Sequence, residues 1–217
     1  MAALRLIIGN RNYSSWSLRP WLALRHAGLG FEEEVIPLDL PDTRARILAR
    51  SPAGRVPILI HGDTTVWDSL AIIEYVAELA PEAGLWPRDP HARATARAIA
   101  AEMHSGFPAM RRALPMNIRR ARRPVAGGDE VEADLERVRE IWRTTRQRFG
   151  QGGPFLFGAF TAADAMYAPV VTRFDTYLVP VDERCAAYIE AIQTLPAMVE
   201  WTAAAKAEPW SMPRHDD

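Results

Sequence analysis

Residues 52–75 read PAGRVPILIHGDTTVWDSLAIIEY, and this stretch determines the predicted fold. The β-branched run at residues 58–60 predicts a short strand, and the Gly-Asp pair after it predicts a turn. Residues 64–67 then supply the returning strand of a hairpin. The apolar spacing of residues 70–79 is helical. The stretch therefore predicts a strand pair followed directly by a helix.

Two places in this stretch suit the binding of a small peptide. Pro57 stands at the entrance of a strand, so Val56–Pro57 is a bond for which the cis form is accessible, at about 0.5–1 kcal/mol. The cis form turns the N–H and C=O of Val56 outward, where an extended peptide can pair with them. Asp68 and Ser69 head the helix and offer a hydroxyl and free N–H groups to an anion. A small peptide that carries a carboxylate fits between the two.

Composition restricts the class of protein. The chain has 217 residues, enough for one domain or two small ones, and its net charge of −1 argues against a nucleic-acid or membrane-surface protein. Cys185 is the one cysteine, so no internal disulfide can form. No run approaches the roughly 18 apolar residues of a membrane span, and no His, Cys or carboxylate cluster has metal-ligand spacing. We expect a cytoplasmic protein that uses no metal.

Four elements are predicted upstream of the central stretch. They are a strand at residues 4–8, a helix at 18–27, a strand within 31–40, around residues 34–38, and a helix at 43–50. We expect Ser17 to be the N-cap of the first helix, which places Pro20 in the first turn, where its missing N–H costs little. The whole order, strand-helix-strand, helix, hairpin and helix, is that of a thioredoxin-like α/β domain.

A linker at residues 81–90, with three prolines and one glycine, separates this domain from a helical one. Helical patterns follow at residues 91–114, 129–149, 161–177, 182–193 and 196–207. We therefore expect an α/β domain over residues 1–80 and an all-α domain over residues 91–217. Thr161 and Asp164 have the spacing of a capping box, with a role in folding rather than in catalysis.

The loop before the first helix reads YSSWSLR at residues 13–19 and is the candidate reactive segment. A hydroxyl there can donate to a bound thiolate, and the helix N-terminus favours the negative charge. The alternative is that these serines only cap the helix, which fits Ser17 better than Ser14. Cysteine-type thiol chemistry is disfavoured because the loop contains no thiol.

Together these motifs resemble the glutathione transferase superfamily. The Val-Pro after Gly-Arg and the block Asp-Ser-Leu-Ala-Ile-Ile-Glu-Tyr look like its glutathione-binding signature. The resemblance implies the glutathione transferase architecture, a thioredoxin-like domain followed by an all-α domain, with glutathione as co-substrate. It also implies a homodimer, because the two domains of such folds usually meet the opposite domains of a partner.

The loop resembles the serine-type members, and the zeta class most. That pattern has a Ser-Ser pair before the helix and an arginine five residues after the active serine, so counting back from Arg19 gives Ser14 as the catalytic residue. Trp16 stands where the zeta pattern has a cysteine, which argues against zeta-type isomerase chemistry. Tyr13 is a second candidate hydroxyl, because other classes use a tyrosine near this place.

The resemblance also implies the binding residues. In the family picture Ser69 holds the γ-glutamyl carboxylate, and the Asp68 side chain approaches the α-amino group. The expected glutathione-binding residues are Ser14, Ser15, Arg55, Val56, Pro57, Asp68 and Ser69. The expected electrophile-binding residues, on the first helix of the second domain, are Met103, Phe107, Met110 and Arg111. For the apolar members of this second set, ordinary core packing is the alternative.

The sequence is interpreted as a serine-type glutathione transferase that ionises the glutathione thiol and directs the thiolate at a small apolar electrophile. One alternative is a glutathione-dependent cis–trans isomerase of the maleylacetoacetate type. Another is a non-catalytic transferase-like module that binds partner proteins. The arginine-rich residues 119–123 are either a solvated loop or an attraction for anionic substrates; nucleic-acid binding would need interleaved aromatics.

Overall fold

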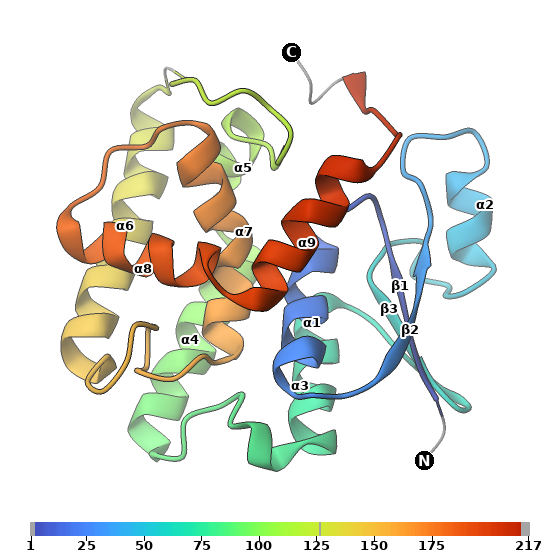
Figure 1. The fold of residues 1–217 in the computed structure, drawn as a ribbon, viewed down its shortest axis with the longest axis horizontal. Coiled ribbons are helices and arrows are strands. Elements are labelled where there is room, and N and C mark those ends of the chain that lie inside the picture. The colour runs from blue at the N-terminus through green and yellow to red at the C-terminus, as the bar shows by residue number, and fades with distance from the viewer. Residues whose placement is uncertain (1–2, 126, 214–217) are drawn as a thin grey trace.

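A four-stranded sheet organises the N-terminal part of the chain in the computed structural model, which describes residues 3–125 and 127–213 (Figure 1). The elements in order are β1 (Leu4–Ile8), α1 (Ser15–His26), β2 (Phe31–Val35), α2 (Thr43–Leu48), β3 (Ile58–His61), β4 (Thr64–Val66) and α3 (Ser69–Leu79). The strand order is β2-β1-β3-β4; β1 is parallel to β2 and antiparallel to β3, and β4 is antiparallel to β3. The thioredoxin-like α/β domain is confirmed.

The period-2 alternation of the strands decides which helices cover which face of the sheet. Leu6 and Ile8 of β1 belong to the large core formed with α1 and α3. Ile7, between them, points to the other face and packs with Ile58 of β3 and Ile47 of α2. Figure 1 shows the result, with α2 alone on one side of the sheet and α1 and α3 on the other.

The described part of the chain after α3 is helical, as predicted. The elements are the 3₁₀ turn η1 (Pro81–Ala83), α4 (Pro90–Ser105), α5 (Pro108–Ala113), α6 (Asp129–Phe149), α7 (Ala162–Thr176), α8 (Glu183–Gln193) and α9 (Pro196–Ala207). Helix α7 is the centre of this domain, with nearly every side chain buried. Because α1 packs against α7, a single apolar core continues from the sheet domain into the helical one.

The helix expected over residues 91–114 is wrong in its length, because the structure divides it into α4 and α5. Phe107 adopts a left-handed conformation with a φ of 62° between the two helices. Pro108 explains the break, since proline has no N–H to donate and disfavours the α conformation in the residue before it. The strand expected within residues 31–40 occupies only the first half of that range, Phe31–Val35, and ends before the predicted centre because Pro37 prevents its continuation.

The capping box at the start of α7 is confirmed. The N–H and the hydroxyl of Thr161 both donate to Asp164 Oδ2, at 2.8 Å each. Asp164 Oδ1 also accepts the N–H of Leu156, at 3.1 Å, so the carboxylate fixes the preceding loop as well. Burial raises the pKa of Asp164 to about 6.

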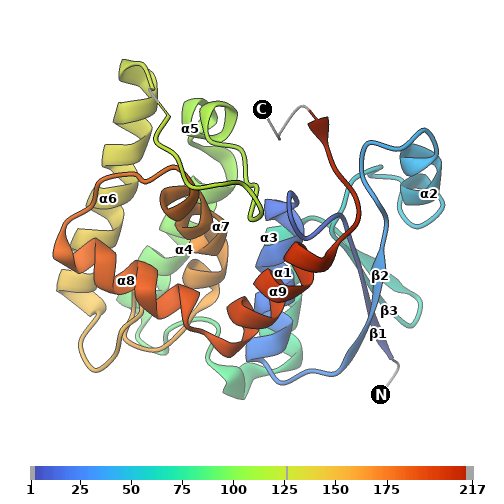
Figure 2. The same cartoon turned by 45° about the horizontal axis from the view of Figure 1, so that its top comes forward.

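Helix α9 returns the end of the chain to the sheet domain. Figures 1 and 2 both show α9 beside α1, with the segment after it running towards the β1–α1 loop. Trp201 of α9 packs edge-on against Trp21 of α1, with ring centroids 5.2 Å apart, and its Nε1 donates to the Arg11 carbonyl oxygen. This packing places the C-terminal segment next to the predicted reactive loop.

Candidate active site

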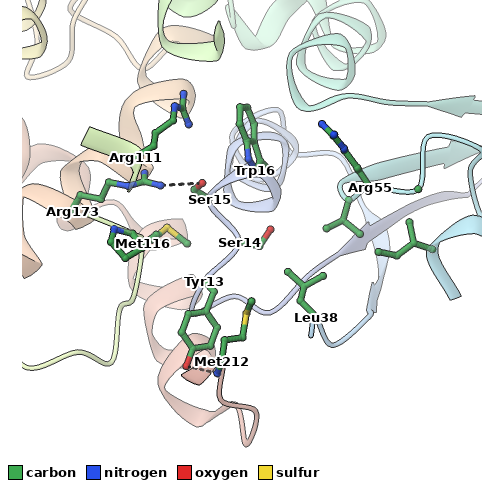
Figure 3. A pocket seen from close by; sticks show the side chains of 14 residues that line it. Tyr13, Ser14, Ser15, Trp16, Leu38, Arg55, Arg111, Met116, Arg173 and Met212 are labelled. Carbon is green, nitrogen blue, oxygen red and sulfur yellow. Dashed lines mark hydrogen bonds between the residues drawn. The ribbon is translucent and has the colours of Figure 1, made fainter. Parts of the chain in front are cut away.

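A cavity of about 460 Å³ lies where the two domains and the C-terminal segment meet (Figure 3). The sheet domain contributes the loop before α1, Leu38, the segment before β3 and Ile47 of α2. The helical domain contributes α5, the residues after it and α7. The lining residues are Tyr13, Ser14, Ser15, Trp16, Leu38, Ile47, Gly54, Arg55, Val56, Arg111, Pro115, Met116, Arg173 and Met212.

Ser14 is the N-cap of α1, so the prediction that Ser17 caps this helix is wrong. The Ser14 Oγ accepts the N–H of Ser17 at 3.3 Å and lies 2.8 Å from the Ser17 Oγ. The Ser17 hydroxyl is turned inward instead, where it accepts the Gly9 N–H of the chain leaving β1, at 3.0 Å. Pro20 consequently lies inside the helix rather than in its first turn. Ser14 therefore caps the helix and lines the cavity at the same time.

The segment before β3 lies across the cavity from the α5–α7 side. Val56–Pro57 is a cis peptide bond, the form whose polar groups suit an extended peptide. Arg55 and Val56 line the cavity, whereas Pro57 is buried at the start of the strand. In Figure 3, Ser14 lies between Arg55 on one side and Arg111 and Arg173 on the other.

Asp68 and Ser69 begin α3, outside the lining of the cavity. Asp68 Oδ1 accepts the N–H groups of Leu70 and Ala71, at 3.1 and 3.4 Å, and so caps the helix. The Ser69 hydroxyl is buried, and among the described residues it has no hydrogen-bond partner. Such a hydroxyl is costly unless a ligand satisfies it, and a helix N-terminus favours an anion.

His104 of α4 connects this helix start to Trp16. Its Nε2 lies 2.9 Å from Asp68 Oδ2, and its ring meets Trp16 edge-on with centroids 5.3 Å apart. The sequence predicted no role for His104, because a lone histidine on a helix is more often simply packed. Its position between Asp68 and the loop before α1 is a product of the domain packing.

Three arginines gather beside the cavity. Arg173 Nη2 donates to Ser15 Oγ at 3.3 Å, and the guanidinium carbons of Arg19 and Arg111 lie 4.3 and 4.9 Å from the Trp16 ring centroid. Burial lowers the pKa of all three, that of Arg173 to about 9. The field of Arg111 lowers the pKa of Arg19 and Arg173 further, so the three charges are close enough to repel.

Of the four residues expected to bind the electrophile, only Arg111 lines the cavity. Met103, Phe107 and Met110 are buried in the large core, the alternative that the sequence left open for them. Met103 contributes through its backbone, because its carbonyl oxygen accepts a hydrogen bond from Arg111.

Tyr13 and the C-terminal segment close another side of the cavity. The Tyr13 hydroxyl oxygen accepts hydrogen bonds from Arg119 Nη2 and from the N–H of Met212, at 3.1 Å each. Arg119 also donates to the carbonyl oxygens of Glu208 and Trp210. Arg119, the first of the arginines in residues 119–123, therefore holds the segment after α9 against the cavity. No sequence pattern indicates Met212, which reaches the site only because α9 folds back over α1.

Neither metal-binding clusters nor membrane helices were found within residues 3–125 and 127–213. No group of three or more His, Cys, Asp or Glu side chains there could hold a metal ion. No helix there is both long and apolar enough to cross a membrane.

Comparison with known proteins identifies the family. Residues 13–79 match the model of the glutathione S-transferase N-terminal domain, and residues 128–204 match that of the C-terminal domain. The chain is 32% identical over 211 residues to a maleylacetoacetate isomerase of Rhizobium meliloti, covering 83% of this chain and 90% of that protein. It is 35% identical over 97 residues to a probable maleylacetoacetate isomerase of Caenorhabditis elegans, covering 45% of this chain but only 44% of that protein.

The fold agrees with solved structures of the same family. A glutathione transferase homologue from Burkholderia, solved with bound glutathione, superimposes with a TM-score of 0.71 at 22% identity, covering 95% of this chain and 100% of that one. The two family models and the relative from Rhizobium meliloti lead to one conclusion: the chain belongs to the glutathione S-transferase family.

Proposed function

We propose that the protein is a serine-type glutathione transferase, with the glutathione sulfur held at the Ser14 hydroxyl. The observation that carries the proposal is the hydrogen-bond order around Ser14. Ser17 Oγ accepts the Gly9 N–H, so its own hydrogen is available for Ser14 Oγ, 2.8 Å away. Ser14 Oγ also accepts the Ser17 N–H. Either hydroxyl can donate in the Ser14–Ser17 pair. When Ser17 donates, both bonds are directed to the Ser14 oxygen, and Ser14 can donate its own hydrogen to a thiolate in the cavity.

The energies are of the size that thiol activation needs. A hydrogen bond to a charged group contributes about 1.5–3 kcal/mol, and the N-terminus of a helix adds about 0.3–1 kcal/mol. Together they lower a thiol pKa by roughly 1.5 to 3 units from its ordinary value near 8.5. Between about half and nearly all of the bound thiol would then be ionised at pH 7, ready to attack an electrophilic carbon.

The rest of glutathione has matching groups on the sheet domain. The backbone of Val56, after the Arg55 side chain, is suited to pair with the cysteinyl part of the tripeptide. The unsatisfied Ser69 hydroxyl at the start of α3 fits the γ-glutamyl carboxylate, and the half-exposed Asp68 carboxylate fits the ammonium group. Ser15, next to Ser14, completes the set and is oriented by Arg173.

The substrate proposed for the thiolate is a small electrophile, because the cavity holds about 460 Å³. Retention on glutathione-agarose, followed by turnover of a panel of electrophiles with and without glutathione, tests the function. Glutathione-dependent turnover of at least one electrophile is expected. A protein that neither binds glutathione nor turns over any of the panel would contradict the proposal and favour a non-catalytic module.

A glutathione-dependent isomerase is the second candidate, favoured by the relative from Rhizobium meliloti, whose match covers 83% of this chain. Isomerisation regenerates glutathione, whereas conjugation consumes it. Measuring glutathione consumption beside substrate loss therefore separates the two. Trp16, where the zeta pattern has a cysteine, is the residue in which this chain departs from that class.

The proposed assembly is a homodimer in the cytoplasm. Trp67, just before α3, is 46% exposed, a large apolar side chain of the kind that a subunit interface covers. A single sedimenting species near the chain mass of 24.3 kDa at micromolar concentration would refute the dimer.

A further inference from the structure

His104 belongs to α4 of the helical domain, but its ring reaches the start of α3 in the sheet domain. Its Nε2 lies 2.9 Å from Asp68 Oδ2, and its ring meets the Trp16 ring edge-on. The His104 side chain is 27% exposed and that of Asp68 is 52% exposed. The pair therefore joins the two domains while leaving the carboxylate within reach of a ligand.

The two oxygens of the Asp68 carboxylate have different partners. Oδ1 accepts the N–H groups of Leu70 and Ala71 and is used by the helix cap. Oδ2 is the oxygen that His104 contacts. A carboxylate oxygen can accept more than one hydrogen bond, so Oδ2 can take a second donor beside the imidazole. His104 thus fixes the direction of the oxygen that remains available to a ligand.

Two buried polar atoms adjoin this carboxylate without a hydrogen-bond partner among residues 3–125 and 127–213. They are the hydroxyl oxygen of Ser69, the next residue in the chain, and His104 Nδ1. Buried polar groups in proteins are normally paired, because an unpaired one loses its hydration without compensation. Two such atoms on either side of Asp68 indicate a place that a polar ligand completes.

We propose that His104 is a positioning residue for the ammonium group of glutathione. In its neutral form it donates to Asp68 and holds the carboxylate in place for the ammonium. In its protonated form it competes with the ammonium for the same carboxylate, because a second cation then lies beside it. The inference rests on the proposed function, in which Asp68 receives the ammonium, and adds a pH dependence to glutathione binding.

The direction of this dependence follows from the groups around the ring. Arg19 of α1 and Arg111 of α5 lie over the indole that His104 touches, and Tyr167 of α7 packs against α4 through its hydroxyl. Guanidinium and carboxylate groups ordinarily stay charged, and phenols neutral, between pH 5.5 and pH 8, whereas histidine changes its charge there. Glutathione affinity should therefore fall as the pH falls through this range.

The test uses S-methylglutathione, which has no thiol proton, so that thiol ionisation does not contribute to the pH profile. Calorimetry on the parent protein should show a dissociation constant about fivefold higher at pH 5.5 than at pH 8. Fivefold corresponds to about 1 kcal/mol, the upper range for a half-exposed pair of charges. His104→Gln keeps an N–H donor but carries no charge, so it should retain the affinity at pH 8 and lose the pH dependence.

His91→Gln is the matched control, because His91 is an exposed histidine at the start of the same helix. This variant should keep the pH profile of the parent. His104→Ala, which removes the donor, should weaken binding at pH 8 by at least about threefold and raise the KM for glutathione more than it lowers kcat. Identical pH profiles for the parent and His104→Gln would overturn the proposal.

A second measurement needs no variant. If protonation of His104 weakens binding, then binding must in turn expel the proton, because the coupling of two equilibria is reciprocal. Binding of S-methylglutathione to the parent should release protons at pH 6 and almost none at pH 8. Calorimetry in two buffers of different ionisation enthalpy counts these protons. Binding at pH 6 without proton release would contradict the proposed competition.

The same experiments separate this inference from the proposed function. Binding with the expected pH profile, but without turnover of any electrophile, would refute the transferase and leave the role of His104 standing. Glutathione-dependent turnover with a flat binding profile would do the reverse. A parent that binds no S-methylglutathione at any pH would refute both.

A role for His104 at the thiol predicts another result. The imidazole would then act on the sulfur, and His104→Gln would shift the thiolate titration of bound glutathione while leaving the profile of S-methylglutathione unchanged. The geometry favours the ammonium end, because His104 contacts Asp68 and does not line the cavity beside Ser14. That pair of observations would overturn the assignment.

Discussion

Replacing Ser14 with alanine tests the structural basis of the proposed activity. The variant loses the only serine hydroxyl that both caps α1 and lines the cavity with its oxygen already engaged by Ser17. Loss of a hydrogen bond worth about 1.5–3 kcal/mol to the thiolate corresponds to a rise of roughly 1 to 2 units in the pKa of bound glutathione. Conjugation at pH 7 should therefore fall by about 10- to 100-fold.

Thiolate absorbance, titrated with pH in the glutathione complex, measures this pKa directly. Glutathione affinity should change little, because Val56, Asp68 and Ser69 hold the remainder of the tripeptide. The unfolding free energy should fall by about 0.5–2 kcal/mol, because the N-cap of α1 is lost as well. Kinetics and titration must therefore be measured at a temperature where the variant is fully folded.

Ser15→Ala and Tyr13→Phe are the matched controls. Ser15 is as buried as Ser14, but its hydroxyl is bonded by Arg173, and the Tyr13 oxygen accepts bonds from Arg119 and Met212. If Ser14→Ala leaves the thiolate titration unmoved while either control shifts it, the wrong hydroxyl has been assigned. If none of the three moves it, the serine-type mechanism is refuted.

Three further predictions concern stability and the cover of the site. Asp164→Ala should lower the unfolding free energy by about 2–4 kcal/mol in denaturant titrations, because three buried donors lose their acceptor; a loss below 0.5 kcal/mol would contradict this. The folded-state pKa of Asp164 is raised from 3.8 to about 6, so its proton is held more tightly in the folded protein and its contribution to stability declines as the pH rises from about 4 to 6. The stability advantage of the parent over Asp164→Asn should accordingly shrink by about 2–3 kcal/mol between pH 4 and pH 7, and a constant difference would refute the assignment. Arg119→Ala should accelerate hydrogen exchange at the Met212 amide without moving the glutathione pKa, and unaltered exchange would show that Arg119 does not fasten the segment.

The sequence by itself determined the local structure and the family. The strand pair and the helix start at Asp68 follow from residues 52–75, because turns and caps are decided by neighbouring residues. The Thr161–Asp164 capping box was predictable for the same reason. The break between α4 and α5 also has a local cause, Pro108, but the helical spacing of the apolar residues on both sides hides it from a sequence-based prediction. Pro57 made the cis form of the Val56–Pro57 bond accessible, but the local preference is trans, so the cis bond was not determined locally.

The N-cap of α1 could not be decided locally. Ser14 and Ser17 are both competent caps by residue type. The Gly9 N–H, at the end of β1, takes the Ser17 hydroxyl as its acceptor and leaves the cap position to Ser14. A contact between the sheet and the helix therefore selected the serine that faces the cavity.

The tertiary structure alone created the cationic side of the site. Arg19, Arg111 and Arg173 lie on three different helices, and nothing in their spacing along the chain indicates that they converge. Met212 reaches Tyr13 only because α9 returns across α1. Such contacts depend on how apolar faces pack between domains, and the pattern of a single helix shows which face is buried but not which residues it will meet.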